Sequence, residues 1–508
     1  MRRGLLLAAS TVVLYALAFP PFGLWPLAFV AFVPMIYAQH RVLPARWSGL
    51  AVGVGVGGVF AYTLTPGLLD GRVAVVFHLL PVFVGALAAG IAWRSRGFHE
   101  RTGYRWFTWS APVAWVAIDF LRLSAGEVAA ATFGYPAYAL WRHPLLLQPI
   151  SVLGIHALEL LVFLANWAIA GVLLDAPRAR RNAAVVGGVV VTWVVAGFVL
   201  MGSAPTTVTV AAVQSGVTRG AAGWEERYAR DVEQTREAAA RGAQLVVWNE
   251  VGLQFDAASN PEDLSALASE LGIHLAVGYG FTDDGGRHHN EVLLLGPDGS
   301  VLGSYGKDHP GTFAGDYSDT GGTYPVHDTA LGRLATIVCY DLDFTDTARA
   351  MARGGAQLVA TPSADVPAIS RTHYTHLVFR AVENRVAMVK ADNEFDSAII
   401  DPWGRIVASS VSTRGGGRVT LVAGVPLGPG PSPWVRWGDW FGWLAVAATA
   451  GFGLLSVRSR RQLRPGPGPL EGGGQGDDEG VVVAARDELH PDRAAVDDAH
   501  GDGHDRVP

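Results

Sequence analysis

The chain has 508 residues, of which 50% are hydrophobic and 17% charged, and its formal net charge is −6. This composition is too apolar for a typical soluble protein and too charged for membrane spans throughout, so it indicates a membrane part joined to a globular part. The acidic balance, without a basic stripe interleaved with aromatics, excludes a nucleic-acid partner. The only cysteine is Cys339, which excludes any intramolecular disulfide.

Long apolar stretches fill the N-terminal part of the chain. Each is about the length that crosses ~30 Å of hydrocarbon. They cover approximately 4–19, 24–39, 48–66, 73–93, 106–121, 145–174 and 183–202. The first follows Met1-Arg2-Arg3 without a small-residue cleavage site after it, so we interpret it as a retained span and not as a signal peptide. Residues 1–204 are therefore predicted to form an N-terminal transmembrane bundle of about seven spans.

Arginines in the short loops predict the orientation of these spans. They fall in alternate connections, which the positive-inside rule assigns to the cytoplasm. They are Arg2 and Arg3, then Arg41 and Arg46, then Arg94, Arg96, Arg101 and Arg105, and then Arg178, Arg180 and Arg181. The intervening loop "TPGLLDGR" (65–72) is poor in basic residues. Because an odd number of spans follows a cytoplasmic N-terminus, residue 205 and the residues after it are predicted to lie on the outer side of the membrane.

Two details inside the bundle predict how it packs. The many glycines of "GLAVGVGVGGVF" (49–60) indicate close helix packing. An ionisable side chain is costly within an apolar span, so Asp119 is expected to form a structural ion pair with Arg122, one turn away.

The C-terminal part contains one more apolar stretch. Residues 437–456 are followed by several arginines, which predicts a C-terminal transmembrane helix that returns the chain to the inner side. Residues 457–508 lack hydrophobic periodicity and are rich in glycine, proline and acidic residues. We expect them to form a disordered cytoplasmic tail.

Residues 205–425 have a different pattern, typical of an α/β domain. Short β-branched or apolar runs are bounded by turn residues. Examples are "AQLVVWNE" (243–250), "LATIVCYD" (334–341) and "AQLVATPS" (356–363). Helical stretches are expected at 223–241 and 261–271. The segments "GPDG" (296–299) and "DPWG" (401–404) lie between apolar runs and predict hairpin turns.

The basic residues are strongly biased toward arginine. Of the 39 lysines and arginines, only Lys307 and Lys390 are lysine. An ammonium is a compact point charge, whereas a guanidinium is a wide planar fork. A lysine in such a chain can mark a position that arginine cannot fill, although a chance occurrence is the simpler alternative.

Three reactive groups follow strand-like runs: Glu250, Lys307 and Cys339. Strand ends are where α/β domains tend to place chemistry. A thiol nucleophile needs a base to take its proton and a cation to stabilise the developing oxyanion, and these residue types supply both. Each residue also has a structural explanation on its own: a small buried hydrophobe for the cysteine, a helix-start carboxylate for the glutamate and a surface charge for the lysine.

The order Glu, Lys, Cys, with "NEVLLLGPDGSVLGSYGKDH" (290–309) and "IVCYD" (337–341), resembles the nitrilase, or carbon–nitrogen hydrolase, superfamily. The segments "LAFPPFGLWPLAFVAFVPM" (17–35) and "APVAWVAIDFLR" (111–122), followed by a hydrolase domain and a closing span, resemble the apolipoprotein N-acyltransferase family. The resemblance implies a multi-span helical membrane bundle carrying an α-β-β-α sandwich, here at 205–425, on the outer side of a bacterial plasma membrane. Both termini would be cytoplasmic.

The resemblance also implies a role for each matching residue. Glu250 would be the general base, Lys307 would stabilise the oxyanion, and Cys339 would form a thioester with a fatty acyl chain. Supporting or substrate-side positions are matched by Tyr340 and Asp341 after the nucleophile, by Asp316 after the lysine, and by Trp224 at the mouth of a lipid-facing cleft.

By the same resemblance, the reaction takes an acyl chain from a membrane phospholipid and transfers it to the N-terminal amine of diacylglyceryl-modified cysteine in apolipoproteins. No cofactor is expected, and the family resemblance implies a monomer. His373 and His376 lie three residues apart and could share a helix face, but without a third ligand we predict no metal site.

Several departures from the family pattern leave alternatives open. Asn249 replaces the usual proline before the glutamate, "DHPGTFAGDYSD" (308–319) lengthens the spacing from the lysine to the acid, and "TPSADVPAIS" (361–370) replaces an Asn-Asp-x-Trp stretch. One alternative is a membrane-tethered nitrilase-type amidohydrolase that passes the acyl group to water. Another is a non-catalytic relative that binds lipoproteins.

Overall fold

The computed structural model describes residues 1–69, 78–123, 132–217, 223–312, 315–366, 369–410 and 417–462. Residues Met1–Arg461 form one compact unit. Most of the predicted tail, residues 463–508, lies outside the described residues, as do parts of the loop at 65–72 and of the stretches 308–319 and 361–370.

The strands of the compact unit form two six-stranded sheets within these ranges. The first has the order β12-β1-β2-β3-β4-β5, and the second has the order β11-β10-β9-β8-β7-β6. The strands of the first sheet are β1 (Thr207–Gln214), β2 (Leu245–Val247), β3 (His274–Thr282), β4 (His288–Leu295), β5 (Val301–Gly306) and β12 (Val419–Pro426). Those of the second are β6 (Val326–Thr329), β7 (Gly332–Thr336), β8 (Leu358–Ser363), β9 (Ala387–Asp392), β10 (Ala398–Ile400) and β11 (Ile406–Ser409).

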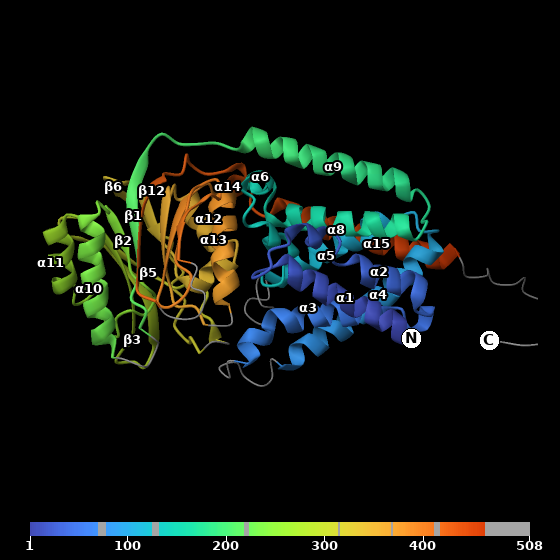
Figure 1. The fold of residues 1–508 in the computed structure, drawn as a ribbon, viewed down its shortest axis with the longest axis horizontal. Helices are drawn as coiled ribbons and strands as arrows, with labels where there is room; N and C mark the ends of the chain where they lie inside the picture. The colour runs from blue at the N-terminus through green and yellow to red at the C-terminus, as the bar shows by residue number, and fades with distance from the viewer. Residues whose placement is uncertain are drawn as a thin grey trace, which may run out of the picture. The chain divides into compact units, whose positions relative to one another are not determined.

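Helices cover the outer face of each sheet, which gives the four layers of an α-β-β-α sandwich (Figure 1). The first sheet carries α10 (Trp224–Ala240) and α11 (Glu262–Leu271), and the second carries α12 (Thr347–Arg353) and α13 (Ser370–Asn384). Alternate side chains of β2 enter different cores. Leu245 and Val247 pack in the cluster shared with the second sheet, and Val246 packs in the cluster under α10 and α11. Burial on both faces explains why these strands are continuous apolar runs in the sequence.

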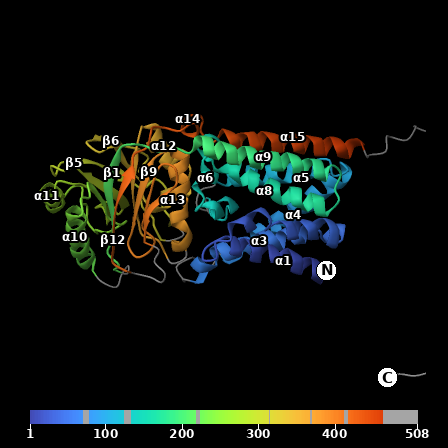
Figure 2. The same ribbon diagram turned by 45° about the horizontal axis from the view of Figure 1, so that its top comes forward.

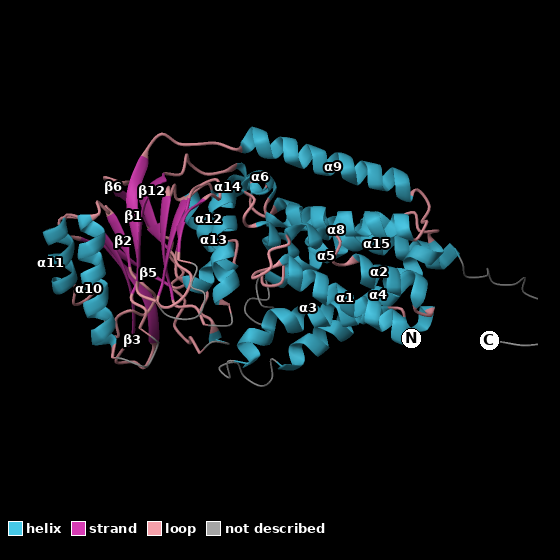
Figure 3. Ribbon diagram, viewed as in Figure 1, coloured by secondary structure: helices cyan, strands magenta, loops and turns pink. Residues whose placement is uncertain are grey.

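The rest of the compact unit is helical, and strands are confined to the sandwich (Figure 3). The long helices run side by side (Figure 2), and the ring of Trp443 in α15 (Trp440–Gln462) contacts that of Phe120 in α5 (Phe107–Leu123). The helices are α1 (Arg2–Ala18), α2 (Val33–Tyr37), α3 (Gly49–Leu69), α4 (Leu80–Arg101), α5 (Phe107–Leu123), α6 (Pro144–Leu147), α7 (Ile150–Leu153), α8 (Ile155–Leu173), α9 (Ala179–Leu200), α14 (Pro433–Trp437) and α15 (Trp440–Gln462). The predicted fold class, a helical membrane bundle with an α-β-β-α domain, is confirmed.

Among the described residues, four segments are long and apolar enough to cross a membrane. They are Ala45–Leu64, Ile155–Leu173, Ala179–Leu200 and Trp440–Arg460. The helices α1, α4 and α5 coincide with further predicted stretches, so the total of about seven N-terminal spans stays a prediction. The helix α15 runs from Trp440 to Gln462 and so extends past residue 456, the end of the predicted span, because residues 457–462 hold no helix-breaking Gly or Pro.

Glycines bring α3 and α4 into close contact. A Cβ on Gly53 would lie 2.8 Å from the carbonyl oxygen of Gly85 and 2.9 Å from the Cβ of Ala89. A Cβ on Gly49 would lie only 2.1 Å from the carbonyl oxygen of Ala89. Absent side chains therefore allow the two backbones to touch, as the glycine-rich sequence predicts. The predicted ion pair of Asp119 with Arg122 is also present, at 3.3 Å.

The helix α13 and the segment after β7 join the sandwich to the bundle. The carboxylate of Glu383 accepts a hydrogen bond from the backbone N–H of Ile155, the first residue of α8, at 2.7 Å. Arg385 donates to the side chains of Gln148 (2.6 Å) and Ser151 (3.0 Å). Thr132 donates to the backbone carbonyl of Asp343 at 2.9 Å. These buried polar contacts fix α13 and the segment after β7 relative to the apolar helices.

We predict that Gly53→Ala destabilises the bundle and that Gly90→Ala does not. A methyl group at Gly53 on α3 must push α3 and α4 apart, whereas a Cβ at Gly90 on α4 meets nothing within 4 Å. Overpacking of this kind costs about 1–3 kcal/mol. Thermal unfolding of the detergent-purified variants measures the difference, and equal unfolding temperatures would contradict the packing argument.

Candidate active site

Three strand ends meet at one cavity of about 540 Å³. Glu250 follows β2, Lys307 follows β5 and Cys339 follows β7, and all three line the cavity. They are buried, with 5%, 3% and 6% of their surfaces exposed. The structure thus brings together the three groups that the sequence locates after separate strands.

Lys307 is held between two carboxylates. Its Nζ donates to Oε1 of Glu250 at 2.7 Å and to Oδ2 of Asp316 at 2.8 Å. Asn290 donates to the same two oxygens, at 2.7 Å and 3.0 Å. Burial alone would lower the pKa of Lys307, but the charges of Glu250, Cys339 and Asp316 outweigh it and raise the pKa. The side chain is therefore a fixed cation, and the extra residue between the lysine and the acid does not prevent Asp316 from reaching it.

The other oxygen of Glu250 is also in use. Its Oε2 accepts a hydrogen bond from the backbone N–H of Ala364 at 3.0 Å. The carboxylate is therefore held by donors from three separate segments, those of Asn290, Lys307 and Ala364. A carboxylate positioned so tightly keeps one geometry toward the cavity, as a base in proton transfer requires.

Cys339 begins the short 3-10 helix η8 (Cys339–Asp343) with a φ of +42°. A non-glycine residue in this left-handed region is strained, and such strain is often found where the chain must aim a functional side chain. Burial raises the pKa of the thiol, the charge of Glu250 raises it further, and the opposing charge of Lys307 does not cancel these effects. These surroundings favour the neutral thiol over the thiolate, and a neutral thiol needs a base before it can attack.

The two residues after the cysteine have different surroundings. Tyr340 lines the cavity, and its ring packs edge-on against Phe344. Asp341 is not among the described residues that line the cavity, and it braces the loop: its carboxylate accepts from the hydroxyl of Tyr305 at 2.7 Å and from the backbone N–H groups of Val338 and His309, both at 2.9 Å. Burial raises the pKa of Asp341 to about 6. Its contribution is to hold the backbone around Cys339.

Trp224 lies elsewhere. It is the first residue of α10, and its ring packs against Tyr228 and Phe255, in the layer outside the first sheet. It is absent from the described residues that line the cavity. Residues 218–222, which precede it, lie outside the described residues, so its role at a lipid-facing mouth stays a prediction.

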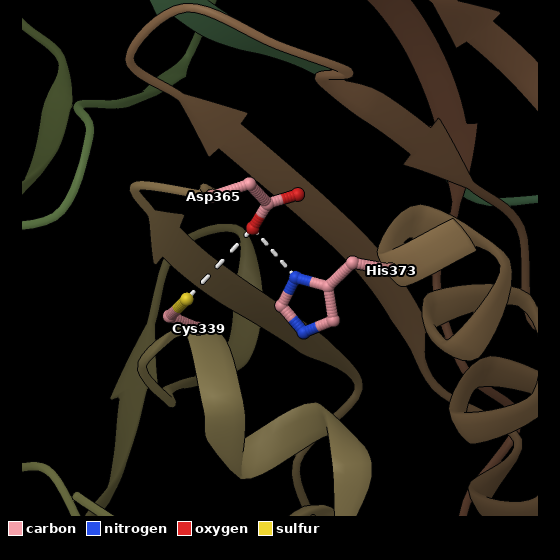
Figure 4. Close-up of side chains that lie close together, drawn as sticks. All are labelled: Cys339, Asp365 and His373. Atoms are coloured by element: carbon pink, nitrogen blue, oxygen red, sulfur yellow. Dashed lines mark hydrogen bonds and ion pairs between the residues drawn. The ribbon is translucent and has the colours of Figure 1, made fainter. Parts of the chain in front are cut away.

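A second group of polar side chains borders the cysteine, and sequence reasoning missed it. Oδ1 of Asp365 accepts from Sγ of Cys339 at 3.8 Å and from Nδ1 of His373 at 2.6 Å (Figure 4). Oδ2 of Asp365 accepts from Nζ of Lys390 at 3.0 Å. We call Asp365, His373, Lys390 and their acidic partners Asp343 and Asp392 the Asp365 network. Two clues in the sequence pointed to it, the rarity of lysine and the departure at 361–370.

The ligand types of Cys339, Asp365 and His373 are those that can hold a metal ion, and their atoms lie within 4.8 Å of one another. However, Nδ1 of His373 already donates to Asp365, and Lys390 compensates the same carboxylate. The charge that a metal would supply is therefore provided by protein cations, and we interpret the group as a charge-balanced hydrogen-bond network.

Comparison with known proteins agrees with this arrangement on both halves of the chain. Residues 209–428 match the carbon–nitrogen hydrolase family, and residues 12–168 match the apolipoprotein N-acyltransferase N-terminal domain. The chain is 29% identical over 518 aligned residues to the apolipoprotein N-acyltransferase of Geobacter metallireducens, which covers 90% of this chain and 96% of that protein. The chain belongs to the apolipoprotein N-acyltransferase family, within the nitrilase superfamily.

Other relatives of this family member match the hydrolase domain alone. The human omega-amidase NIT2 is 30% identical over 207 residues, which cover 34% of this chain and 75% of that enzyme. Among solved structures, an amidase from Nesterenkonia sp. is 24% identical, with a TM-score of 0.39, and the match covers 44% of this chain and 92% of that one.

The ionisation of His373 gives this N-acyltransferase family member a testable pH dependence of stability. Burial alone would lower the pKa of His373, but the charges of Asp365 and Asp343 raise it to about 10, above the ~6.5 of an unfolded histidine. The stabilisation is therefore complete below pH ~6.5 and is lost as the pH rises toward the folded value. We expect His373→Asn, which keeps a donor but no charge, to lose stability less steeply than wild type across this range. Thermal unfolding at successive pH values measures both slopes, and parallel curves would contradict the assignment.

Proposed function

We propose that this chain transfers a fatty acyl chain from a membrane phospholipid, through a thioester on Cys339, to the N-terminal amine of diacylglyceryl-cysteine in apolipoproteins. The observation that carries the proposal is the meeting of Glu250, Lys307 and Cys339 at one cavity, in a domain joined to apolar helices. The family match over both halves of the chain supports it, because the relative from Geobacter metallireducens is an apolipoprotein N-acyltransferase.

In the first half-reaction, Glu250 takes the proton of the Cys339 thiol while Sγ attacks the ester carbonyl carbon of the donor lipid. Negative charge develops on the carbonyl oxygen, and the fixed ammonium of Lys307 stabilises it. The C–O bond then breaks, Glu250 gives the proton to the leaving alkoxide, and a lysophospholipid departs. The acyl chain remains on sulfur as a thioester.

In the second half-reaction, the uncharged amine of the acceptor attacks the thioester carbonyl carbon. Glu250 takes a proton from the attacking nitrogen and returns it to the sulfur as the C–S bond breaks. The products are an N-acylated lipoprotein and the neutral Cys339 thiol. Since Asp316 and Asn290 hold Lys307 and Glu250 in place, they serve as positioning residues for both steps.

We also propose that the hydrolase domain lies on the extracytoplasmic side of a bacterial plasma membrane, with both termini in the cytoplasm. The alternation of arginine-rich and arginine-poor loops supports this orientation. Both substrates are anchored in the bilayer, so a catalytic domain tied to membrane helices meets them without leaving the surface. The proposed working unit is a monomer, because the three reactive groups come from one chain.

Cys339→Ala, Glu250→Gln and Lys307→Met are each expected to reduce N-acylation by about 10³-fold or more, because each removes one part of a unit that acts together. The test uses the host with its own gene deleted and reads lipoprotein N-termini by mass spectrometry. Loss of the N-linked acyl chain on deletion, restored by wild type alone, supports the proposal. Restoration by Cys339→Ala would refute it. Restored variants are compared at equal protein abundance in the membrane.

Lys307→Arg is expected to be almost as inactive as Lys307→Met, although the charge is kept. The ammonium lies in a buried space with acceptors at 2.7 Å and 2.8 Å, and a planar guanidinium needs more room. Arg333→Lys, at an exposed ion pair on β7, is the matched control and should retain activity. The same complementation test reads both variants, and full activity of Lys307→Arg would show that only charge is required.

A second candidate function is hydrolysis, with water as the acyl acceptor. The polar groups His288, His289 and Gln254 in the cavity wall favour it, as does the match of the hydrolase domain to omega-amidases. The purified chain, given a phospholipid and a synthetic diacylglyceryl-cysteine peptide, separates the two. N-acylated peptide in equal amount to lysophospholipid supports transfer, whereas free fatty acid without acylated peptide supports hydrolysis.

A further inference from the structure

The charges of two carboxylates, Glu250 and Asp365, act on the sulfur of Cys339. Glu250 belongs to the segment after β2, and Asp365 belongs to the segment after β8. The thiol donates its hydrogen bond to Asp365, with 3.8 Å between Sγ and Oδ1. The S–H in this structure is therefore directed toward a residue that the proposed reaction does not use.

The carboxylate of Asp365 is fixed by several donors besides the thiol. Oδ1 also accepts from Nδ1 of His373 at 2.6 Å and from Oγ of Ser363 at 2.9 Å, and Oδ2 accepts from Nζ of Lys390 at 3.0 Å. Its own backbone N–H donates to Asp392 at 3.1 Å. With two cations against it and no exposed surface on its neighbours, Asp365 is held as an anion in one orientation. Such a group is a poor proton acceptor and a good hydrogen-bond acceptor.

Lys390 anchors the arrangement from β9. All three of its N–H groups are used, by Asp365 at 3.0 Å, by Asp392 at 2.8 Å and by the backbone carbonyl of Asp396 at 3.0 Å. His373, from α13, completes the support through its second ring nitrogen, which forms an ion pair with Asp343 at 3.2 Å. The sulfur is thus bordered by a preformed, fully buried group of charges.

We propose that Asp365, fixed by Lys390 and His373, accepts the S–H of Cys339 in the resting protein and keeps the nucleophile a protonated thiol until the acyl donor is bound. Asp365 is a positioning residue in this scheme, because it acts through the cysteine and forms no bond to substrate. The inference rests on the proposed role of Cys339 as the nucleophile.

The charged groups that face the sulfur have opposing effects. Lys307 and, at longer range, Lys390 favour the thiolate, whereas Glu250 and Asp365 oppose it. Removal of Asp365 takes away the carboxylate that accepts the S–H and leaves the cations behind. A resting thiolate is also the form that oxidants and alkylating agents attack. Keeping the proton on sulfur therefore protects the site between turnovers and leaves Glu250 to remove the proton only when a carbonyl carbon is in place.

The test is the pH dependence of alkylation by iodoacetamide, a neutral reagent that reacts with the thiolate. Cys339 is the only cysteine, so the intact mass of the detergent-purified full chain reports this residue alone. We expect Asp365→Asn to lower the pH midpoint of alkylation by at least about one unit, which makes the reaction about tenfold faster at a fixed pH below the midpoint. Asp365→Glu, which restores the charge, should bring the midpoint back toward the wild-type value.

The matched control is Asp328→Asn, an exposed aspartate on β6 of the same domain, which should leave the midpoint unchanged. An unchanged midpoint in a folded Asp365→Asn protein would overturn the proposal, and so would a midpoint that rises.

A second variant gives a shift of opposite sign and keeps the test valid if Asp365→Asn does not fold. His373→Asn retains a donor to Asp365 but removes a positive charge, so its midpoint should rise. A midpoint that falls or stays constant in this variant would refute the proposed arrangement. Because alkylation requires no acyl donor or acceptor, these results are independent of whether the chain transfers or hydrolyses the acyl group. Loss of the transferase activity itself is read separately, from the lipoprotein N-termini.

Discussion

The active site depends on the burial of two ammonium groups, each paired with two carboxylates. Lys307 lies between Glu250 and Asp316, and Lys390 lies between Asp365 and Asp392. An isolated charge in such an interior would cost several kcal/mol, so neither cation is tolerable without its acids, and removal of one partner leaves an uncompensated charge. The sulfur of Cys339 lies between the two arrangements and is influenced by both.

This electrostatic arrangement is tied to the membrane part through backbone as well as side chains. The backbone carbonyl of Asp343, at the end of the helical turn that starts with Cys339, accepts a hydrogen bond from Thr132. The ring of Tyr138 stacks on His376 at 3.9 Å between centroids, and the carboxylate partner of that histidine is Asp343. The position of the thiol therefore depends on contacts with the segments that precede α8, as well as on its own sheet.

The sequence predicted the architecture because periodic features determine it. Apolar stretches predicted the helices of the bundle, β-branched runs predicted strands in both sheets, and the segments at 296–299 and 401–404 lie between the paired strands β4 and β5 and the paired strands β10 and β11, as expected of hairpins. The three groups at strand ends could be proposed for the same reason: a strand end is visible in a sequence. The family resemblance rested on two further features: the order of those groups along the chain, and the joining of a membrane bundle to a hydrolase domain.

The Asp365 network could not be predicted in the same way. Asp365, His373 and Lys390 come from a loop, a helix and a strand, and they meet only because α13 packs against the second sheet. In the sequence, His373 and His376 lack a third metal ligand, and Lys390 is distinguished only by its residue type. In the structure, the partners of His373 are the carboxylates of Asp365 and Asp343. Trp224 shows the converse case: a matching sequence position gave no information on which layer its ring would enter.

The backbone of Cys339 gives one further consequence. Its φ of +42° is a conformation that glycine adopts without strain and that any side chain makes less favourable. If the protein had no need of the thiol, replacing the cysteine with glycine would remove this strain. Selection for stability alone would therefore favour glycine at this position. The positive φ favours glycine at this position, so packing alone does not explain the cysteine. This argues against the interpretation of Cys339 as only a small buried hydrophobe.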